Sequence, residues 1–253
     1  MTNLLNVLVV EDNVINQKVV VKMLERLQIH PSVAVNGKEA VRIISSQPYD
    51  IVFMDIQMPE MDGLEATRVI RAMESTGSHP IIIALTANAM IGDRERCLDA
   101  GMDDYLAKPV KQSDIESIIL KWFPASTEPH GEVLLPVTES IPSKIDPKRI
   151  EQIQEIGDSG LLKELLMLYL EDLDQFSDGV TSAVSDENFK LIYEYSHKLK
   201  GSSANLGIES IREACISMET LARQNKKDDI ARHIIVMQQL MSEIRMYITQ
   251  TYL

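Results

Sequence analysis

No apolar run in this chain approaches the roughly 20 residues that a helix needs to cross a bilayer. The longest such stretches, Val7–Val10 and Ile81–Leu85, have the length of buried strands. The start, Met1-Thr2-Asn3, lacks the basic and apolar regions of a secretory signal. The only two cysteines, Cys97 and Cys215, lie far apart and form no CxxC motif. They fit reduced thiols better than a disulfide framework, so a cytoplasmic location is expected.

The chain also lacks a surplus of positive charge. Its formal net charge is −13. Residues 1–123 hold 12 basic and 17 acidic residues, and residues 124–253 hold 13 and 21. Neither part has the basic surface that a nucleic-acid backbone requires, so DNA and RNA are not expected partners.

A proline-rich segment divides the chain. Residues 124–145 contain four of the ten prolines, and proline interrupts both helices and central strands. The length of 253 residues fits about two domains. We therefore predict a first domain over residues 1–123, a linker over 124–145 and a second domain over 146–253.

The first part alternates short apolar runs with helical patterns. Five runs are typical of buried strands: Val7–Val10, Ser32–Val35, Ile51–Met54, Ile81–Leu85 and Tyr105–Ala107. Repeated strand–helix units predict an α/β doubly wound fold, with a five-stranded parallel sheet covered by helices on both faces. After the linker, apolar residues recur three and four positions apart throughout, which predicts an all-α antiparallel bundle.

Charged and polar residues follow the predicted strands at their carboxyl ends. They are Glu11, Asp12, Asp55, Thr86 and Lys108. Any one of them alone would be an ordinary cap or surface residue, but parallel strands bring all five to one crevice. Clustered carboxylates need a cation, and oxygen ligands suit Mg²⁺. A lysine and a hydroxyl beside that ion would hold phosphoryl oxygens, and an aspartate nucleophile can form an acyl phosphate.

Four stretches resemble the receiver domain of two-component response regulators, from Asn6 to about Phe123. They read VLVVEDNVINQ, DIVFMDIQMPEMDGLEATRVIR, IIIALTANAM and CLDAGMDDYLAKPV. The resemblance implies that Asp55 is the phosphoacceptor. It also implies Mg²⁺ contacts from Asp12, Asp55 and the main-chain carbonyl of Gln57, with Glu11 acting through a metal-bound water.

The same resemblance implies roles for the remaining residues of the crevice. Lys108 would pair with the phosphoryl oxygens, ahead of a cis peptide bond to Pro109. Thr86 would swing towards the phosphoryl group, and Tyr105 would turn inward as the conformational readout. Gln57 should influence hydrolysis of the acyl phosphate. A dehalogenase-type phosphatase would need a second aspartate at the position of Gln57, which disfavours that alternative.

One histidine in the second part differs from the other four in its context. His30, His79, His130 and His233 are taken as surface residues. His197 lies in a helical pattern whose apolar seam falls on another face, with Lys200 and Gly201 close by. A glycine in mid-helix costs about 1 kcal/mol relative to alanine, so we expect Gly201 to clear space beside the imidazole.

The stretch HKLKGSSANLG resembles the signature of histidine-containing phosphotransfer (HPt) domains. The resemblance implies that His197 accepts a phosphoryl group on a ring nitrogen, that Lys200 assists and that Gly201 opens the docking face. We therefore expect a phosphorelay protein that has no ATP-binding kinase domain of its own. Asp55 would be phosphorylated by an upstream histidine kinase in a Mg²⁺-dependent step, and His197 would pass the group to a downstream response-regulator receiver.

Two alternatives stay open. A free-standing relay is favoured because the chain begins with Met1, and the first alternative is the C-terminal fragment of a hybrid sensor histidine kinase, since the chain contains no ATP-binding boxes. In the second alternative, phosphorylation only gates the binding of a partner to the helical domain. Transfer to a downstream receiver separates a relay from such a binding module.

Overall fold

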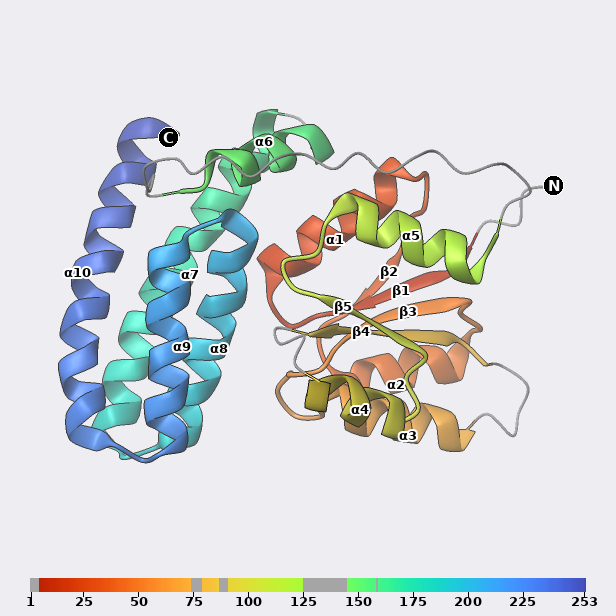
Figure 1. Ribbon diagram of the computed structural model, residues 1–253, viewed down its shortest axis with the longest axis horizontal. Coiled ribbons are helices and arrows are strands. Elements are labelled where there is room, and N and C mark those ends of the chain that lie inside the picture. Colours follow the sequence, from red (N-terminus) through yellow and green to blue (C-terminus); the bar gives the residue numbers. More distant parts are fainter. Residues whose placement is uncertain (1–4, 74–78, 87–90, 125–144, 158) are drawn as a thin grey trace.

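Two structural units lie side by side in the computed structural model, a sheet covered by helices and a bundle of long helices (Figure 1). The structure describes residues 5–73, 79–86, 91–124, 145–157 and 159–253. The predicted linker over 124–145 lies outside the described residues except for its two ends, so the domain boundaries stay a prediction.

The first unit is built on a parallel sheet. Its strands are β1 (Val7–Val10), β2 (Ser32–Ala34), β3 (Ile51–Asp55), β4 (Ile81–Thr86) and β5 (Asp104–Ala107). All neighbouring pairs are parallel, in the order β2-β1-β3-β4-β5. The residues of β1 and β3 are buried throughout, because helices cover both faces of the central strands.

Helices cover the two faces of this sheet unequally. They are α1 (Val14–Arg26), α2 (Gly37–Ser46), α3 (Gly63–Met73), α4 (Ile91–Asp99) and α5 (Gln112–Trp122). The first and last lie over one face, and the other three lie over the opposite face (Figure 1). The predicted doubly wound α/β fold is confirmed.

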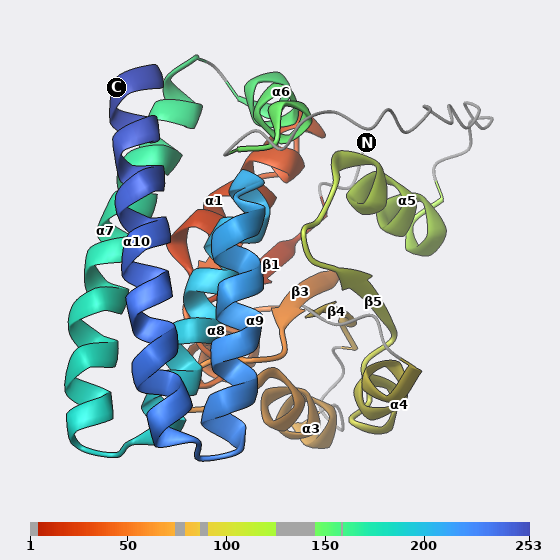
Figure 2. The same cartoon turned by 60° about the vertical axis from the view of Figure 1, so that its left-hand side comes forward.

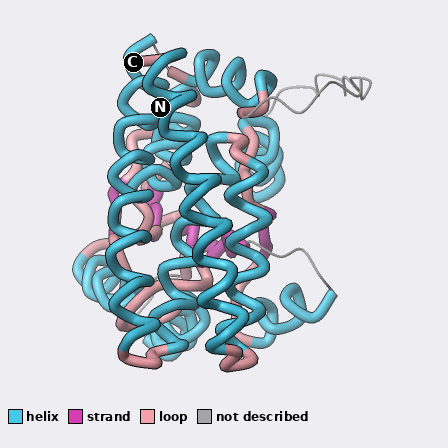
Figure 3. The backbone as a smooth tube through the Cα atoms, turned by 90° about the vertical axis from the view of Figure 1, so that its left-hand side faces the viewer, coloured by secondary structure: helices cyan, strands magenta, loops and turns pink. Residues whose placement is uncertain are grey.

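The second unit is entirely helical where it is described. Its helices are α6 (Pro147–Ile156), α7 (Ser159–Ser185), α8 (Phe189–Leu206), α9 (Glu209–Arg223) and α10 (Lys227–Thr251). The last four run up and down beside one another, with the strands of the sheet behind them in Figure 3. Gly207 ends α8 in the left-handed conformation at φ 72°, a conformation that glycine adopts without strain. The predicted helical bundle is confirmed.

The carboxyl edge of the sheet faces α8 of the bundle (Figure 2). The short helix α6 lies across the top of this arrangement and packs beside α1. Buried residues of the α1/α5 face and of the bundle belong to one continuous apolar cluster, which includes Ile15, Ile115 and Leu165. Apolar burial therefore stabilises the contact between the two units as well as each unit alone.

Candidate functional site

Three carboxylates meet at the carboxyl end of the sheet. Glu11 and Asp12 follow β1, and Asp55 is the last residue of β3. One oxygen from each carboxylate lies within 4.8 Å of the other two. Glu11 is fully buried and Asp55 is only 4% exposed. The sheet thus brings together the three acids that the sequence singles out, in surroundings that strengthen their mutual repulsion.

Burial and repulsion raise the pKa values of two of these acids. Burial first, and then the negative charge of Asp55, raise the pKa of Glu11 to about 8, against the opposing effect of Lys108. The same two causes raise the pKa of Asp12 to about 6. A group of negative charges held in this way favours a cation among the carboxylates.

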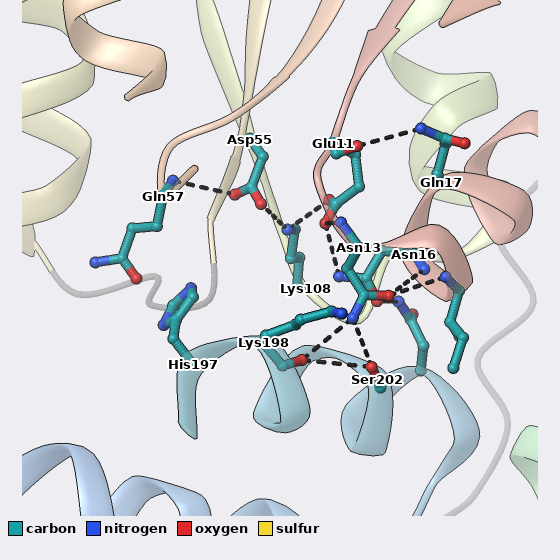
Figure 4. Close-up of polar contacts among 12 residues, drawn as sticks. Glu11, Asn13, Asn16, Gln17, Asp55, Gln57, Lys108, His197, Lys198 and Ser202 are labelled. Carbon is teal, nitrogen blue, oxygen red and sulfur yellow. Dashed lines mark hydrogen bonds and ion pairs between the residues drawn. The ribbon is translucent and has the colours of Figure 1, made fainter. Parts of the chain in front are cut away.

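Lys108 lies between two of the carboxylates. Its Nζ atom is 2.7 Å from Glu11 Oε2 and 2.8 Å from Asp55 Oδ2 (Figure 4). Burial alone would lower the pKa of Lys108, but the charges of Asp55 and Glu11 outweigh it and raise that pKa above its ordinary value. Lys108 therefore stays charged beside the carboxylate that would carry the phosphoryl group.

The remaining residues of the predicted crevice lie around this pocket. Thr86 ends β4, is buried, and accepts at its carbonyl a 2.7 Å hydrogen bond from the backbone of Lys108. The Lys108–Pro109 peptide bond is cis, as the resemblance implies. Tyr105 is half-buried on β5, with the guanidinium of Arg94 5.9 Å from its ring centre. The roles of Thr86, Pro109 and Tyr105 in phosphorylation stay predictions.

His197 is held by a carboxylate from the neighbouring helix. Its Nδ1 atom lies 2.9 Å from Glu219 Oε1 on α9, and Lys200 Nζ lies 2.6 Å from the same oxygen. Burial raises the pKa of Glu219, but the hydrogen bond from His197 and the charge of Lys200 outweigh it and lower that pKa. A proton on Nδ1, held by Glu219, leaves the lone pair of Nε2 available for a phosphoryl group.

The two candidate sites belong to one interface. Gln57, two residues after Asp55, donates from Nε2 to the hydroxyl of Tyr193 on α8 at 2.9 Å. Figure 4 shows the imidazole of His197 rising from α8 towards the loop that carries Asp55 and Gln57. Close by, Asn13 donates from Nδ2 to Ser202 Oγ at 2.6 Å. The predicted donor and acceptor of the phosphoryl group thus lie at the same interface between the units.

A buried chain of polar side chains links the acidic pocket to the bundle. Asn16 Nδ2 donates to Glu11 Oε1 at 2.8 Å, and Asn205 Nδ2 donates to Asn16 Oδ1 at 2.6 Å. Arg149 of α6 donates from Nη2 to Asn205 Oδ1 at 2.9 Å. Gly201 lies over Asn16, so that a Cβ atom on this glycine would come 2.9 Å from Asn16 Nδ2. The space predicted at Gly201 is thus occupied by a side chain of the same protein.

Several of these residues carry no signal in the sequence. Glu219 lies 22 positions after His197 on another helix, and its contact depends on how α8 and α9 are rotated. Asn13 and Asn16 look like ordinary residues at a helix start, and Asn13 does cap α1.

The interpretation of His233 as a surface residue is wrong, because it is half-buried and its Nε2 lies 2.8 Å from the carbonyl of Ala214.

The first unit is an α/β sheet with three clustered carboxylates at its carboxyl edge. The second unit is a helical bundle in which a carboxylate holds one histidine. Docked together, they define a pair of phosphotransfer domains. Comparison with family models agrees with this class. Residues 7–120 match the response regulator receiver domain, and residues 164–247 match the Hpt domain. The chain belongs to these two families and combines them as a two-component phosphorelay protein.

The curated relatives are longer signalling proteins. The chain is 31% identical over 227 residues to the signal transduction histidine-protein kinase BarA of Escherichia coli K12, covering 89% of this chain and 25% of BarA. It is 32% identical over 226 residues to the sensor protein GacS of Pseudomonas syringae pv. syringae, covering 87% of this chain and 25% of GacS. The chain thus spans about a quarter of the length of these relatives.

Two solved structures each match about half of this chain. The receiver domain of sensor histidine kinase PA1611 from Pseudomonas aeruginosa PAO1, with a magnesium ion in its active-site cleft, is 46% identical. That match covers 48% of this chain and 98% of the other, with a TM-score of 0.45. A chain of the Saccharomyces cerevisiae Ypd1–Ssk1 receiver co-crystal is 38% identical, covering 47% and 88%, with a TM-score of 0.45. In the described part of the chain, every helix falls short of the length or apolar character needed to cross a membrane.

Proposed function

We propose that this protein carries a phosphoryl group from Asp55 to His197 within one molecule. The observation that carries the proposal is the docking of the carboxyl edge of the sheet on α8, where both residues face one interface. An upstream histidine kinase supplies the group to Asp55, and a downstream receiver takes it from His197. The chain itself performs only phosphotransfer and needs no ATP.

In the proposed transfer, Nε2 of His197 attacks the phosphorus of the Asp55 acyl phosphate. A P–N bond forms, the P–O bond to Asp55 breaks, and Asp55 leaves as a carboxylate. Lys108 Nζ, 2.8 Å from Asp55 Oδ2, balances the charge of that leaving group. No proton has to leave Nε2, because the proton of the imidazole is on Nδ1 and the new positive charge is balanced by Glu219.

The acidic pocket fits Mg²⁺. Three carboxylates converge within 4.8 Å, and oxygen ligands of this charge suit a hard divalent cation. We assign Asp12, Asp55 and the carbonyl of Gln57 as its ligands, with Glu11 acting through water. When bound, the ion neutralises charge on the phosphoryl oxygens.

The docked arrangement limits which surfaces an upstream kinase or a downstream receiver can reach. The bundle contacts Asn13, Gln57 and the loops around Asp55. An outside partner that approaches Asp55 or His197 would have to bind the same surfaces. The kinase that loads Asp55 and the receiver that unloads His197 would therefore each act when the units have separated. We place this exchange in the cytoplasm, since Cys97 and Cys215 are buried in different domains and are not joined by a disulfide.

One observation favours a second setting for the same chemistry. Among the curated relatives, BarA is a signal transduction histidine-protein kinase and GacS is a sensor protein, and each is about four times the length of the matched region. The receiver and Hpt domains would then be the relay portion of a hybrid kinase. The gene that encodes the chain tells the two settings apart, since a hybrid kinase adds an ATP-binding domain in the same reading frame.

Phosphorylation by a small acyl-phosphate donor with Mg²⁺ tests the relay. In the wild type we expect phosphate on His197, identified by its stability to base and its lability to acid. The label on His197 should disappear in Asp55→Ala, and His197→Ala should keep label on Asp55 alone. Label confined to Asp55 in the wild type would contradict the internal relay and favour a phosphorylation-gated binding module.

The rate law separates transfer within one molecule from transfer between molecules. In the wild type, phosphorylation of His197 should follow first-order kinetics that do not change with protein concentration. A mixture of Asp55→Ala and His197→Ala should phosphorylate His197 more slowly, with a rate that rises with concentration, because it lacks the effective concentration of a tethered pair. If the mixture reacts as fast as the wild type, the intramolecular step is wrong.

Thermal unfolding in the presence of Mg²⁺ tests the metal site. We expect Mg²⁺ to raise the Tm of the wild type, by an amount that grows with the logarithm of the Mg²⁺ concentration once the site is mostly filled. Asp12→Asn should raise the Tm of the metal-free protein, because it removes one charge from a group of crowded carboxylates. The same substitution should abolish most of the Mg²⁺-dependent shift. An equal shift in both proteins would show that Mg²⁺ acts elsewhere.

A further inference from the structure

Tyr193 contacts both candidate sites at once. It lies on α8 one turn before His197, and their rings stack with centres 5.9 Å apart and an angle of 21°. Its hydroxyl lies 2.9 Å from Nε2 and 3.2 Å from Oε1 of Gln57, on the far side of the interface. One side chain therefore touches the imidazole that accepts the group and the loop that carries the donor aspartate.

Arg223 fixes the direction of the hydroxyl. It donates from Nη2 to the Tyr193 oxygen at 2.9 Å, and its guanidinium also lies 4.9 Å from the centre of the tyrosine ring. A guanidinium has only donors, so the hydroxyl must accept from Arg223. The single hydroxyl proton is then free to be donated to Gln57 Oε1. The hydroxyl of Tyr193 thus accepts from Arg223 and from Gln57 Nε2 and donates to Gln57 Oε1, which joins the three side chains in one hydrogen-bonded group.

Gln57 is thereby held at both of its ends. Its backbone nitrogen donates to Asp55 Oδ1 at 3.3 Å, and its side-chain amide is bound to Tyr193. An amide beside a phosphoryl group can orient a water molecule for attack. While Gln57 binds Tyr193, this amide is engaged with the bundle and cannot serve a water molecule at Asp55.

We infer that Tyr193 is a positioning residue that directs the phosphoryl group of Asp55 to His197 rather than to water. Its ring fixes the imidazole, and its hydroxyl holds Gln57. This inference rests on the proposed intramolecular relay. In the competing hydrolysis, a water oxygen bonds to phosphorus, the bond to Asp55 breaks, a proton goes to solvent, and inorganic phosphate leaves.

The ratio of transfer to His197 over hydrolysis by water tests the inference. The protein is phosphorylated by an acyl-phosphate donor, the donor is removed rapidly, and phosphate on His197 and free phosphate are followed over one turnover. Tyr193→Phe keeps the stacked ring and removes only the hydroxyl. We expect it to lower the ratio of transfer to hydrolysis about three- to tenfold, the size of one neutral hydrogen bond.

Two further variants make the result specific. Gln57→Ala removes the amide that would orient water, so adding Tyr193→Phe to it should lower the ratio little further, because the hydroxyl then has no amide to hold. Tyr195→Phe is the matched control. Tyr195 lies on the side of α8 that packs over Gly179 of α7, and its substitution should leave the ratio unchanged.

The outcomes distinguish the inference from the relay itself. If the wild type places no phosphate on His197, the proposed relay fails. If the wild type transfers the phosphoryl group to His197 and Tyr193→Phe shows the same ratio of transfer to hydrolysis, only the inference about Tyr193 is overturned. Additive effects in the double variant overturn it too, as does a loss of domain docking in Tyr193→Phe, measured by small-angle scattering, because the tyrosine would then be merely structural.

Discussion

Replacing Gly201 by leucine should slow transfer from Asp55 to His197 about ten- to a hundredfold while the bundle stays folded. A Cβ atom at this position would come 2.9 Å from Asn16 Nδ2, and leucine adds three more carbons. Asn16 has little freedom to move away, since it is bound to Glu11 and Asn205. Overpacking of this kind costs about 1–3 kcal/mol. Here the cost falls on the contact between the domains and not on the bundle.

The bundle alone should respond in the opposite sense. A glycine in mid-helix is about 1 kcal/mol less favourable than alanine, and leucine is close to alanine. The free energy of unfolding of the bundle should therefore rise in Gly201→Leu as the transfer rate falls. Gly201→Ala should show the same rise with a smaller loss of transfer. Single-turnover kinetics and chemical denaturation check the two effects, and first-order transfer at the wild-type rate in Gly201→Leu would contradict the docking geometry.

The fold and the acidic pocket were predictable because their signals are local. The strand runs such as Ile51–Met54 lie within one residue of the observed elements, and each acid lies at or just after the carboxyl end of its strand. Parallel strands share one carboxyl edge, so the convergence of Glu11, Asp12 and Asp55 follows from topology alone. His197 was likewise singled out by its neighbours in a single helix. Local sequence thus suffices wherever one element, or one rule of topology, determines the neighbourhood.

The contacts between the two sites were not predictable on these grounds. Gln57 and Tyr193 are 136 positions apart, and Asn16 and Asn205 are 189 apart. Such pairs depend on how two separately folded units meet, and no periodicity within either unit specifies that. Gly201 shows the difference well, since its small size was visible in the sequence, whereas the identity of Asn16 as the group above it was not.

Replacing Glu219 by leucine is expected to slow phosphorylation of His197 about ten- to a hundredfold. The substitution removes the carboxylate that binds Nδ1 of His197 at 2.9 Å and Lys200 at 2.6 Å. A hydrogen bond to a charged group contributes about 1.5–3 kcal/mol. Without it, the imidazole is free to place its proton on Nε2, which removes the lone pair that attacks phosphorus. Single-turnover transfer measures the loss, and Glu213→Gln, on the exposed face of α9, is the matched control.

The equilibrium between the two phosphorylated forms should shift as well. Phosphorylation at Nε2 with a proton on Nδ1 makes the ring cationic, and Glu219 stabilises that charge where solvent is largely excluded. In Glu219→Leu the ratio of phosphohistidine to aspartyl phosphate should therefore fall, because only the histidine form loses a counter-charge. Glu219→Gln retains an acceptor for Nδ1–H but lacks the charge. It should therefore preserve most of the transfer rate, but it should still lower the ratio of phosphohistidine to aspartyl phosphate. If both variants left the ratio unchanged, Glu219 would only orient the ring and would not stabilise its charge.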